Sequence, residues 1–577
     1  MTRAASANLW ELRSLKNAFG VGIAARKLEL LGTLEASPLA TAEQVSDLHD
    51  LLCYWRAYPD NGAILGIVER MLDGFDRRPD LRWFREELAD SGIAGTALHF
   101  SFFWPMAVRI AERWPDRITV DWGDFERAKD LEKALHLLVP YAETVGLDAM
   151  RFSPRRWTKL LKGPDETDAG FLIRRFAALQ AGAPLKERLY ESLDIPIRLA
   201  PGPDTPARTR EKWAGAPVVF QTRPPGRARP SLRQAVRGAD FRVRSLPPGD
   251  ARRMIDLANA AMVPRHRDLL VFLHGDERDV RLVDFGDGLQ FVMIGARPGH
   301  RLVLEAVYGF LTLRNGVPIG YLLNSALFGS CELAYNVFET FRGAETARIY
   351  GRFMAVVSRL FGADSFTVDT YQLGLRNQEG VRSGAWWFYY KLGFRPRNPE
   401  IRALVREELA RIEADHSHRT SQDRLRRLAA DNLFYSLGGS RLDVLGRIAM
   451  GNVGVRISRY LAERFGSERE QGIRTCSKEA ARLLGVRDLR HLPPNERTAW
   501  ARWSPLVRIL PGVENWSPAE RRALAAVVRA KGGKRESDFV RLFDGHARLR
   551  HAILDLAKTA VDSGVVVNVP TRETRTP

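Results

Sequence analysis

One stretch, residues 332–396, constrains the fold of this chain more than any other. It begins with an apolar run of strand type at 332–338 and continues into a turn-like segment at 339–344. A helical pattern follows, with these apolar side chains on one face: Ala347, Tyr350, Phe353, Met354, Val357 and Leu360. A second apolar strand at 365–368 and an aromatic helix at 385–394 complete the stretch. This order predicts an α+β unit whose turn opens directly into a helix.

Strand-like segments also precede this stretch. Residues 241–246 alternate between apolar and polar side chains, and residues 289–294 and 302–313 are apolar runs of strand length. Asn315-Gly316 is a turn of the type that joins two antiparallel strands. The sequence therefore predicts a mixed sheet with several antiparallel strands, in an α+β fold.

The chain has 577 residues, which is too many for one hydrophobic core. Apolar residues recur at helical spacing near the N-terminus, as at 43–57 and 63–75. We expect mainly α-helical flanks around the central mixed sheet. The regions are a helical N-terminal region at 1–200, a Pro- and Arg-rich linker at 201–240, the central domain at 241–405 and a helical C-terminal region at 406–577.

The charge balance is strongly basic. Lys and Arg number 88 against 69 Asp and Glu, a net charge of +19. Such a surface attracts phosphate-rich partners, and between Arg223 and Arg244 there are seven Arg and one acid. This run lacks the regularly interleaved aromatics of a single-strand binding surface. A nucleic-acid partner therefore stays an unsupported alternative, and a solvated linker is favoured.

Cysteine and hydropathy patterns give expectations about compartment and metal binding. Cys53, Cys331 and Cys476 lie far apart and form no CxxC pair, which is typical of a reducing compartment and predicts no metal site. The longest uncharged runs contain turn residues and strand alternation, so no membrane span is expected. We expect a cytoplasmic protein.

The turn at the start of the helix carries a recognisable pattern. It consists of Arg342, Gly343, Ala344, Glu345, Thr346 and Ala347. Together with the surrounding strands and the helix that ends in Gly393-Phe394, it resembles the GNAT superfamily of acyl-CoA-dependent N-acyltransferases, whose turn has the pattern [R/Q]-x-x-G-x-[G/A]. The resemblance covers residues 241–397. Small residues there let backbone N–H groups approach a pyrophosphate, which the helix N-terminus also favours.

The resemblance implies acetyl-CoA or another acyl-CoA as acyl donor. The backbone of Val337 and Phe338 would bind the thioester carbonyl, and the turn would bind the pyrophosphate, with Arg348 close by. The turn departs from the family pattern at Glu345, which replaces the central Gly, and a carboxylate there would repel a pyrophosphate. Two alternatives follow: a shifted geometry in which Arg342 or Arg348 compensates, or a catalytically degenerate GNAT-fold protein used for binding or assembly.

The resemblance also implies catalytic roles and an amine acceptor, either a small molecule or a peptide. Tyr389, four residues before Gly393, would act as general acid toward the leaving thiolate. Glu332 and Glu305, on predicted strands, are candidates for the base, because a carboxylate within an apolar strand is costly to bury unless it is paired or functional. The alternatives are a solvent-facing or Arg-paired carboxylate, and a tyrosine that only completes an aromatic cluster.

The connection at 369–383 is longer than is usual for the family. It contains uncharged polar side chains, among them Gln372 and Asn377. Polar groups in such a loop suit recognition of the acceptor, and a purely structural loop is the alternative.

Overall fold

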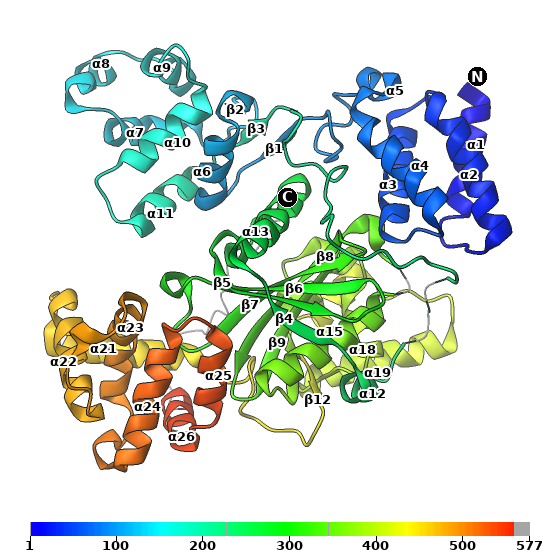
Figure 1. The fold of residues 1–577 in the computed structure, drawn as a ribbon. Helices are drawn as coiled ribbons and strands as arrows, with labels where there is room; N and C mark the ends of the chain where they lie inside the picture. Colours follow the sequence, from blue (N-terminus) through cyan, green and yellow to red (C-terminus); the bar gives the residue numbers. More distant parts are fainter. Residues whose placement is uncertain (1, 225, 227–228, 344, 559–577) are drawn as a thin grey trace.

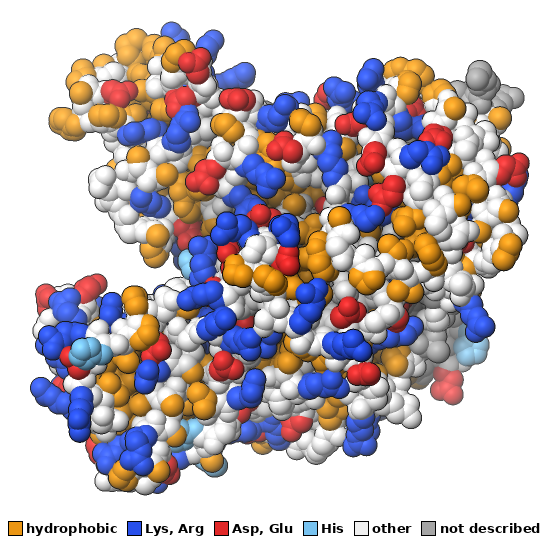
Figure 2. Space-filling view, in the orientation of Figure 1, with side chains coloured by type: hydrophobic (Ala, Val, Ile, Leu, Met, Phe, Trp, Pro, Cys, Tyr) orange, Lys and Arg blue, Asp and Glu red, His pale blue; other side chains and the backbone are white. Residues whose placement is uncertain are grey.

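The structure is a computed structural model that describes residues 2–224, 226, 229–343 and 345–558 (Figure 1). It has a mixed α+β architecture, as the sequence predicts: a nine-stranded sheet lies at the centre and mainly helical bodies surround it. No helix in the described ranges is long and apolar enough to cross a membrane. Figure 2 shows Lys and Arg spread over the visible face with Asp and Glu between them.

The first body is a group of helices at the N-terminus. Its helices are α1 (Thr2–Ser14), α2 (Val21–Ala36), α3 (Ala42–Ala57), α4 (Gly62–Asp73) and α5 (Pro79–Trp83). The α3 and α4 helices match the predicted periodic segments, and each begins at a polar cap, Thr41 and Asn61. The buried Lys27 ammonium lies 2.9 Å from an Asp60 carboxylate oxygen, which ties α2 to the loop before α4.

The second body has a separate hydrophobic core. Its elements are β1 (Leu98–Phe100), α6 (Trp104–Arg113), β2 (Ile118–Val120), α7 (Ala128–Leu138), α8 (Thr144–Ala149), α9 (Pro154–Leu161), α10 (Asp168–Ala178), α11 (Ala183–Leu193) and β3 (Ile197–Leu199). The three strands form an antiparallel sheet in the order β1-β3-β2. The sequence predicted only helices here, because a three-residue strand is too short to show an alternating pattern, and the partners of β3 lie about eighty and about a hundred residues before it.

The central sheet has the strand order β11-β12-β10-β9-β8-β7-β6-β5-β4. Its strands are β4 (Arg242–Ser245), β5 (Gly275–Asp284), β6 (Leu289–Ala296), β7 (Ala306–Arg314), β8 (Val317–Leu327), β9 (Ser330–Val337), β10 (Ser365–Val368), β11 (Arg395–Pro396) and β12 (Leu433–Ser436). Only β9 and β10 are parallel neighbours; the other adjacent pairs are antiparallel. Asn315 and Gly316 both have positive φ, and they form the predicted tight turn between β7 and β8.

Helices cover both faces of this sheet. The helices of the central region are α12 (Leu232–Gly238), α13 (Pro248–Met262), α14 (Leu270–Leu273), α15 (Thr346–Phe361), α16 (Thr370–Leu373), α17 (Gln378–Arg382), α18 (Ala385–Lys391), α19 (Pro399–Ala414) and α20 (Gln422–Leu428). On one face, Phe353 of α15 packs edge-on against Phe291 and Phe310. On the opposite face, Phe272 of α14 lies so close to Gly309 that a Cβ at this glycine would meet its ring at 2.4 Å.

The sheet extends past the predicted domain boundary at residue 405. Strand β12 lies in the segment expected to be helical, yet it pairs with both β10 and β11. Its four residues, Leu433-Phe434-Tyr435-Ser436, are too few to predict a strand directly after charged helical segments. The boundary of the central region therefore falls after β12.

The C-terminal region is a helical bundle, as predicted. Its helices are α21 (Met450–Phe465), α22 (Arg469–Leu484), α23 (Pro494–Ile509), α24 (Pro518–Lys531), α25 (Glu536–Asp544) and α26 (Ala547–Lys558). Ser517 and Glu520 form a capping box at the start of α24. The bundle is joined to the sheet by buried polar contacts: Arg301 donates to the Lys531 carbonyl at 2.9 Å, and the Ser537 N–H donates to the Tyr308 hydroxyl at 2.7 Å.

Two stacked histidines predict a dependence of stability on pH. The His274 and His300 rings lie 3.5 Å apart at 10°. Burial, then the charges of His300 and Arg297, lower the pKa of His274 to about 3. Folded His274 thus stays neutral where an unfolded histidine takes up a proton, so its contribution to stability is complete above about pH 6.5 and falls as the pH drops toward 3.

We expect the wild type to lose about 1 kcal/mol more unfolding free energy than His274→Gln between pH 7 and pH 5, after allowance for partial exposure. Urea unfolding at both pH values measures this difference. A wild-type-to-variant difference that does not change with pH would contradict it.

Candidate active site

The two parallel strands of the central sheet separate part of the way along. Pairing between β9 and β10 runs from Ser330–Ser365 to Glu332–Thr367 and ends there, while β9 continues to Val337. Beyond Glu332, one edge of β9 therefore has no neighbouring strand. Backbone groups on an open strand edge need partners, which a loop, water or an extended ligand supplies.

Hydrogen bonds define which peptide groups face this open edge. The Phe338 N–H donates to the Ile319 carbonyl at 3.0 Å, on the β8 side. Because peptide groups alternate along a strand, those of Tyr335 and Val337 point to the opposite, open side. Two side chains agree with this: Gln372 donates to the Tyr335 carbonyl at 2.9 Å, and Arg342 to the Val337 carbonyl at 3.3 Å.

This alternation corrects one expectation from the sequence. Phe338 was expected to bind a ligand through its backbone, but its N–H is already used within the sheet. Its side chain is buried, and the Arg265 guanidinium lies 3.7 Å from its ring. The N–H of Val337 keeps the predicted position at the open edge.

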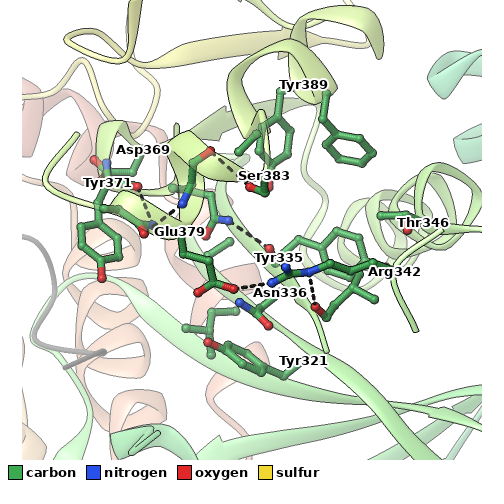
Figure 3. A pocket seen from close by; sticks show the side chains of 18 of the residues that line it. Tyr321, Tyr335, Asn336, Arg342, Thr346, Asp369, Tyr371, Glu379, Ser383 and Tyr389 are labelled. Carbon is green, nitrogen blue, oxygen red and sulfur yellow. Dashed lines mark hydrogen bonds and ion pairs between the residues drawn. The ribbon is translucent and has the colours of Figure 1, made fainter. Parts of the chain in front are cut away.

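The gap between the strands opens into a cavity of about 700 Å³ (Figure 3). Eight of the residues singled out from the sequence line it: Glu305, Glu332, Val337, Arg342, Gly343, Thr346, Ala347 and Tyr389. These residues span 85 positions of the sequence, from 305 to 389, and the central sheet, α15 and α18 bring them together around one cavity. Ala344 lies outside the described residues.

The turn after β9 leads into the N-terminus of α15, at one end of the cavity. Glu345 occupies the N-cap position and makes no side-chain cap hydrogen bond. The Thr346 hydroxyl donates to the Gly343 carbonyl at 2.8 Å, which fixes the turn. The first N–H groups of a helix have no intrahelical acceptor, and an uncapped N-terminus favours an anion.

The position of the Glu345 carboxylate corrects the expectation that this group repels a bound pyrophosphate. It does not line the cavity. Instead it is buried, accepts a hydrogen bond from the Tyr58 hydroxyl at 3.0 Å, and lies 3.5 Å from an Arg314 nitrogen. The charge is thus balanced on the side facing the N-terminal helices, and Glu345 is no evidence for a degenerate phosphate turn.

Arg348, expected near a bound pyrophosphate, is also placed differently. It does not line the cavity, and its guanidinium lies 3.1 Å from Asp287, which also pairs with Arg352 at 2.8 Å. Helical periodicity explains this, because Arg348 lies two positions after Thr346 and so points to another side of α15.

Carboxylates occupy another part of the cavity wall. Glu332 on β9 is the cross-strand partner of Ser325 on β8, so their side chains share one face of the sheet. The Ser325 hydroxyl donates to the Glu305 carboxylate. Glu305 lies one residue before β7 rather than within a strand, and its carbonyl accepts from Lys531 of the C-terminal bundle at 2.7 Å. Ser325 therefore neighbours both candidate bases, Glu332 as its cross-strand partner and Glu305 through a hydrogen bond.

Tyr389 extends from α18 into the cavity wall and is buried among aromatic rings. Its ring packs edge-on against Tyr350 at 5.4 Å and Phe394 at 5.9 Å. Burial raises the pKa of the phenol, and a hydrogen bond with Gln372 offsets part of that rise. The group therefore keeps its proton throughout the neutral range and can donate it.

Another part of the cavity lining comes from residues outside the turn motif. Glu379 of α17 pairs with Arg267 at 2.7 Å and with Arg342, and the latter contact is visible in Figure 3. Burial raises the pKa of Glu379, but the two guanidinium groups outweigh it and hold the pKa below its usual value. Gln372 and Asn377, noted in the long connection, also line the cavity. No motif in the sequence distinguishes Arg267 from the many other Arg residues of the chain.

One buried amide in the lining is unsatisfied. Asn324 of β8 is fully buried, and neither polar atom of its amide has a hydrogen-bond partner among the residues that the structure describes. Leaving such a group unpaired costs about 1–3 kcal/mol, so unpaired amides are rare away from binding sites.

Comparison with known proteins adds no match. No protein-family model matches the chain, and neither a curated protein nor a solved structure does.

Proposed function

We propose that this protein is an N-acyltransferase of the GNAT type, which moves an acetyl or other acyl group from a CoA thioester to an amine. The observation that carries the proposal is the separation of β9 from β10, which leaves the Tyr335 and Val337 peptide edge facing a cavity of about 700 Å³. An extended thioester arm suits such an edge, since it can pair with the strand as another strand would.

The order of elements supports the fold assignment. Antiparallel strands lead to β9, the turn and α15, followed by the parallel strand β10 and by α18 with its Gly393-Phe394 ending. This resembles the GNAT arrangement in both topology and motif order. Among the neighbouring strands of the central sheet, β9 and β10 are the parallel pair, and the cavity begins where their pairing ends.

The residues present fit an acyl-CoA. The uncapped N-terminus of α15, with Gly343 and Thr346 beside it, offers N–H groups and a favourable field to a pyrophosphate. Arg342 adds a cation, part of whose charge Glu379 balances. The Val337 N–H lies at the open edge of β9 and would donate to the thioester carbonyl.

A thioester supplies an activated acyl carbon and a thiolate leaving group. Glu332 or Glu305 accepts a proton from the attacking amine, directly or through a water molecule, as the new C–N bond forms. The Val337 N–H stabilises the developing oxyanion. Tyr389 donates its proton to the sulfur as the C–S bond breaks, which balances the proton lost by the amine.

Isothermal titration calorimetry with acetyl-CoA tests the proposal. We expect saturable one-to-one binding with micromolar to submillimolar affinity, and release of free CoA thiol when a primary amine is added. Absence of binding at millimolar acetyl-CoA would overturn the acyltransferase proposal. Binding without thiol release across an amine panel of amino acids, peptides, diamines and aminoglycosides would favour the binding or assembly protein instead.

A further inference from the structure

The mouth of the cavity is built by three separate parts of the chain. The sheet region contributes Arg342, Gly343 and Thr346, the loop after α1 contributes Asn17, and the linker contributes Pro224 and Arg229. The linker lies against α15, because a Cβ at Gly351 would be 3.6 Å from the Pro230 side chain. Arg229 is therefore held near the first turns of α15.

Arg229 differs from the other cations of the cavity in having no acidic partner. Arg267 and Arg342 both pair with Glu379, whereas Arg229 is exposed and makes no ion pair or hydrogen bond with any residue of the described ranges. An unbalanced guanidinium at a cavity mouth attracts anions, and its fork of donors matches the geometry of a phosphate.

Asn17 is oriented by a neighbour. The Tyr54 hydroxyl donates to its carbonyl oxygen at 2.8 Å, which leaves the amide nitrogen on the other side of the group. Within the described part of the chain, that nitrogen donates no hydrogen bond to another residue, and Asn17 lines the cavity. The amide nitrogen is thus available as a donor beside the cavity.

The N-terminal helices also hold the turn in place. Lys16 donates to the Thr340 carbonyl at 3.0 Å, and Arg208 donates to the Thr340 hydroxyl at 3.3 Å. Thr340 belongs to the short 3-10 helix η6 (Glu339–Phe341), directly before the turn. The bond from Tyr58 to Glu345 adds a third contact, on the other side of the turn. Hydrogen bonds on both sides of the turn therefore attach the N-terminal region beside the mouth.

We infer that Arg229 and Asn17 bind the phosphate-bearing nucleotide end of the acyl carrier. The helical N-terminal region and the linker are thus parts of the carrier site, and they select a phosphorylated nucleotide thioester. This inference rests on the proposed function. Arg229 contributes charge toward a phosphate, and Asn17 contributes a neutral hydrogen-bond donor.

Calorimetry with acetyl-CoA at low and high salt tests the inference on the full chain, with Arg233→Gln as the matched control. Arg233 lies four positions further along, is exposed, and does not line the cavity. We expect Arg229→Gln to weaken binding about fivefold to tenfold and to flatten the salt dependence of the Kd. Asn17→Ala is expected to weaken binding about threefold with the wild-type salt dependence.

The outcomes separate this inference from the proposed function. If the wild type does not bind acetyl-CoA, the proposed function fails. If the wild type binds and Arg229→Gln changes the Kd by less than twofold relative to Arg233→Gln, only the inference about the mouth is overturned. A weaker Kd whose salt dependence matches that of the wild type would also contradict it, because the lost contact would then not involve charge.

Discussion

Tyr389→Phe is expected to lower kcat about 100-fold while the Kd for acetyl-CoA stays within about twofold of the wild type. The substitution removes only the hydroxyl, and the ring keeps its packing against Tyr350 and Phe394. Burial raises the pKa of this phenol, so the proton that the thiolate needs is present throughout the neutral range. Release of CoA thiol with the best amine of the panel gives kcat, and calorimetry gives the Kd.

Tyr390→Phe is the matched control for this measurement. Tyr390 is the next residue of α18, but it stacks on Trp386 at 5.2 Å, carries Arg395 over its ring at 4.1 Å, and does not line the cavity. The kcat of the Tyr390→Phe variant should remain close to that of the wild type. Equal kcat values for the two variants would show that Tyr389 completes an aromatic cluster and transfers no proton.

Glu345→Ala is expected to destabilise the protein by about 3 kcal/mol, because it leaves a buried guanidinium without its closest carboxylate. Arg314 keeps a contact with Asp287 at 3.8 Å, which places the cost at the lower end of the usual range for a broken buried pair. The Tyr58 hydroxyl also loses its acceptor. Urea unfolding measures the loss, and calorimetry with acetyl-CoA should show no gain in affinity.

Glu339→Ala serves as the control, since Glu339 is exposed and lies in η6 next to the same turn. A change within about 0.5 kcal/mol is expected there. Tighter acetyl-CoA binding by Glu345→Gly or Glu345→Ala would restore the idea that this carboxylate repels a pyrophosphate. Unchanged stability of Glu345→Ala would contradict the buried ion pair with Arg314.

Local patterns were sufficient for much of the central region. The apolar run before Val337, the small residues of the turn and the helical stripe of α15 are all encoded within a few residues, so β9, the turn and α15 were predictable. The turn type between β7 and β8 was equally local, because Asn315-Gly316 tolerates positive φ. Strands β1, β3 and β12 were not predictable, since each is short and its partners lie far away in sequence.

The same contrast applies to the candidate site. The sequence by itself pointed to part of the cavity lining. The Tyr389 phenol and the small-residue turn belong to short motifs, and the two carboxylates stand out in apolar segments. Only the tertiary structure decided where each charge goes. The Glu345 carboxylate contacts Arg314 and Tyr58, and Arg348 pairs with Asp287. Arg229 and Asn17 line the cavity from other regions of the chain. The physical reason is that the partners of a charge are set by contacts across the folded chain, which the order of residues along it does not display.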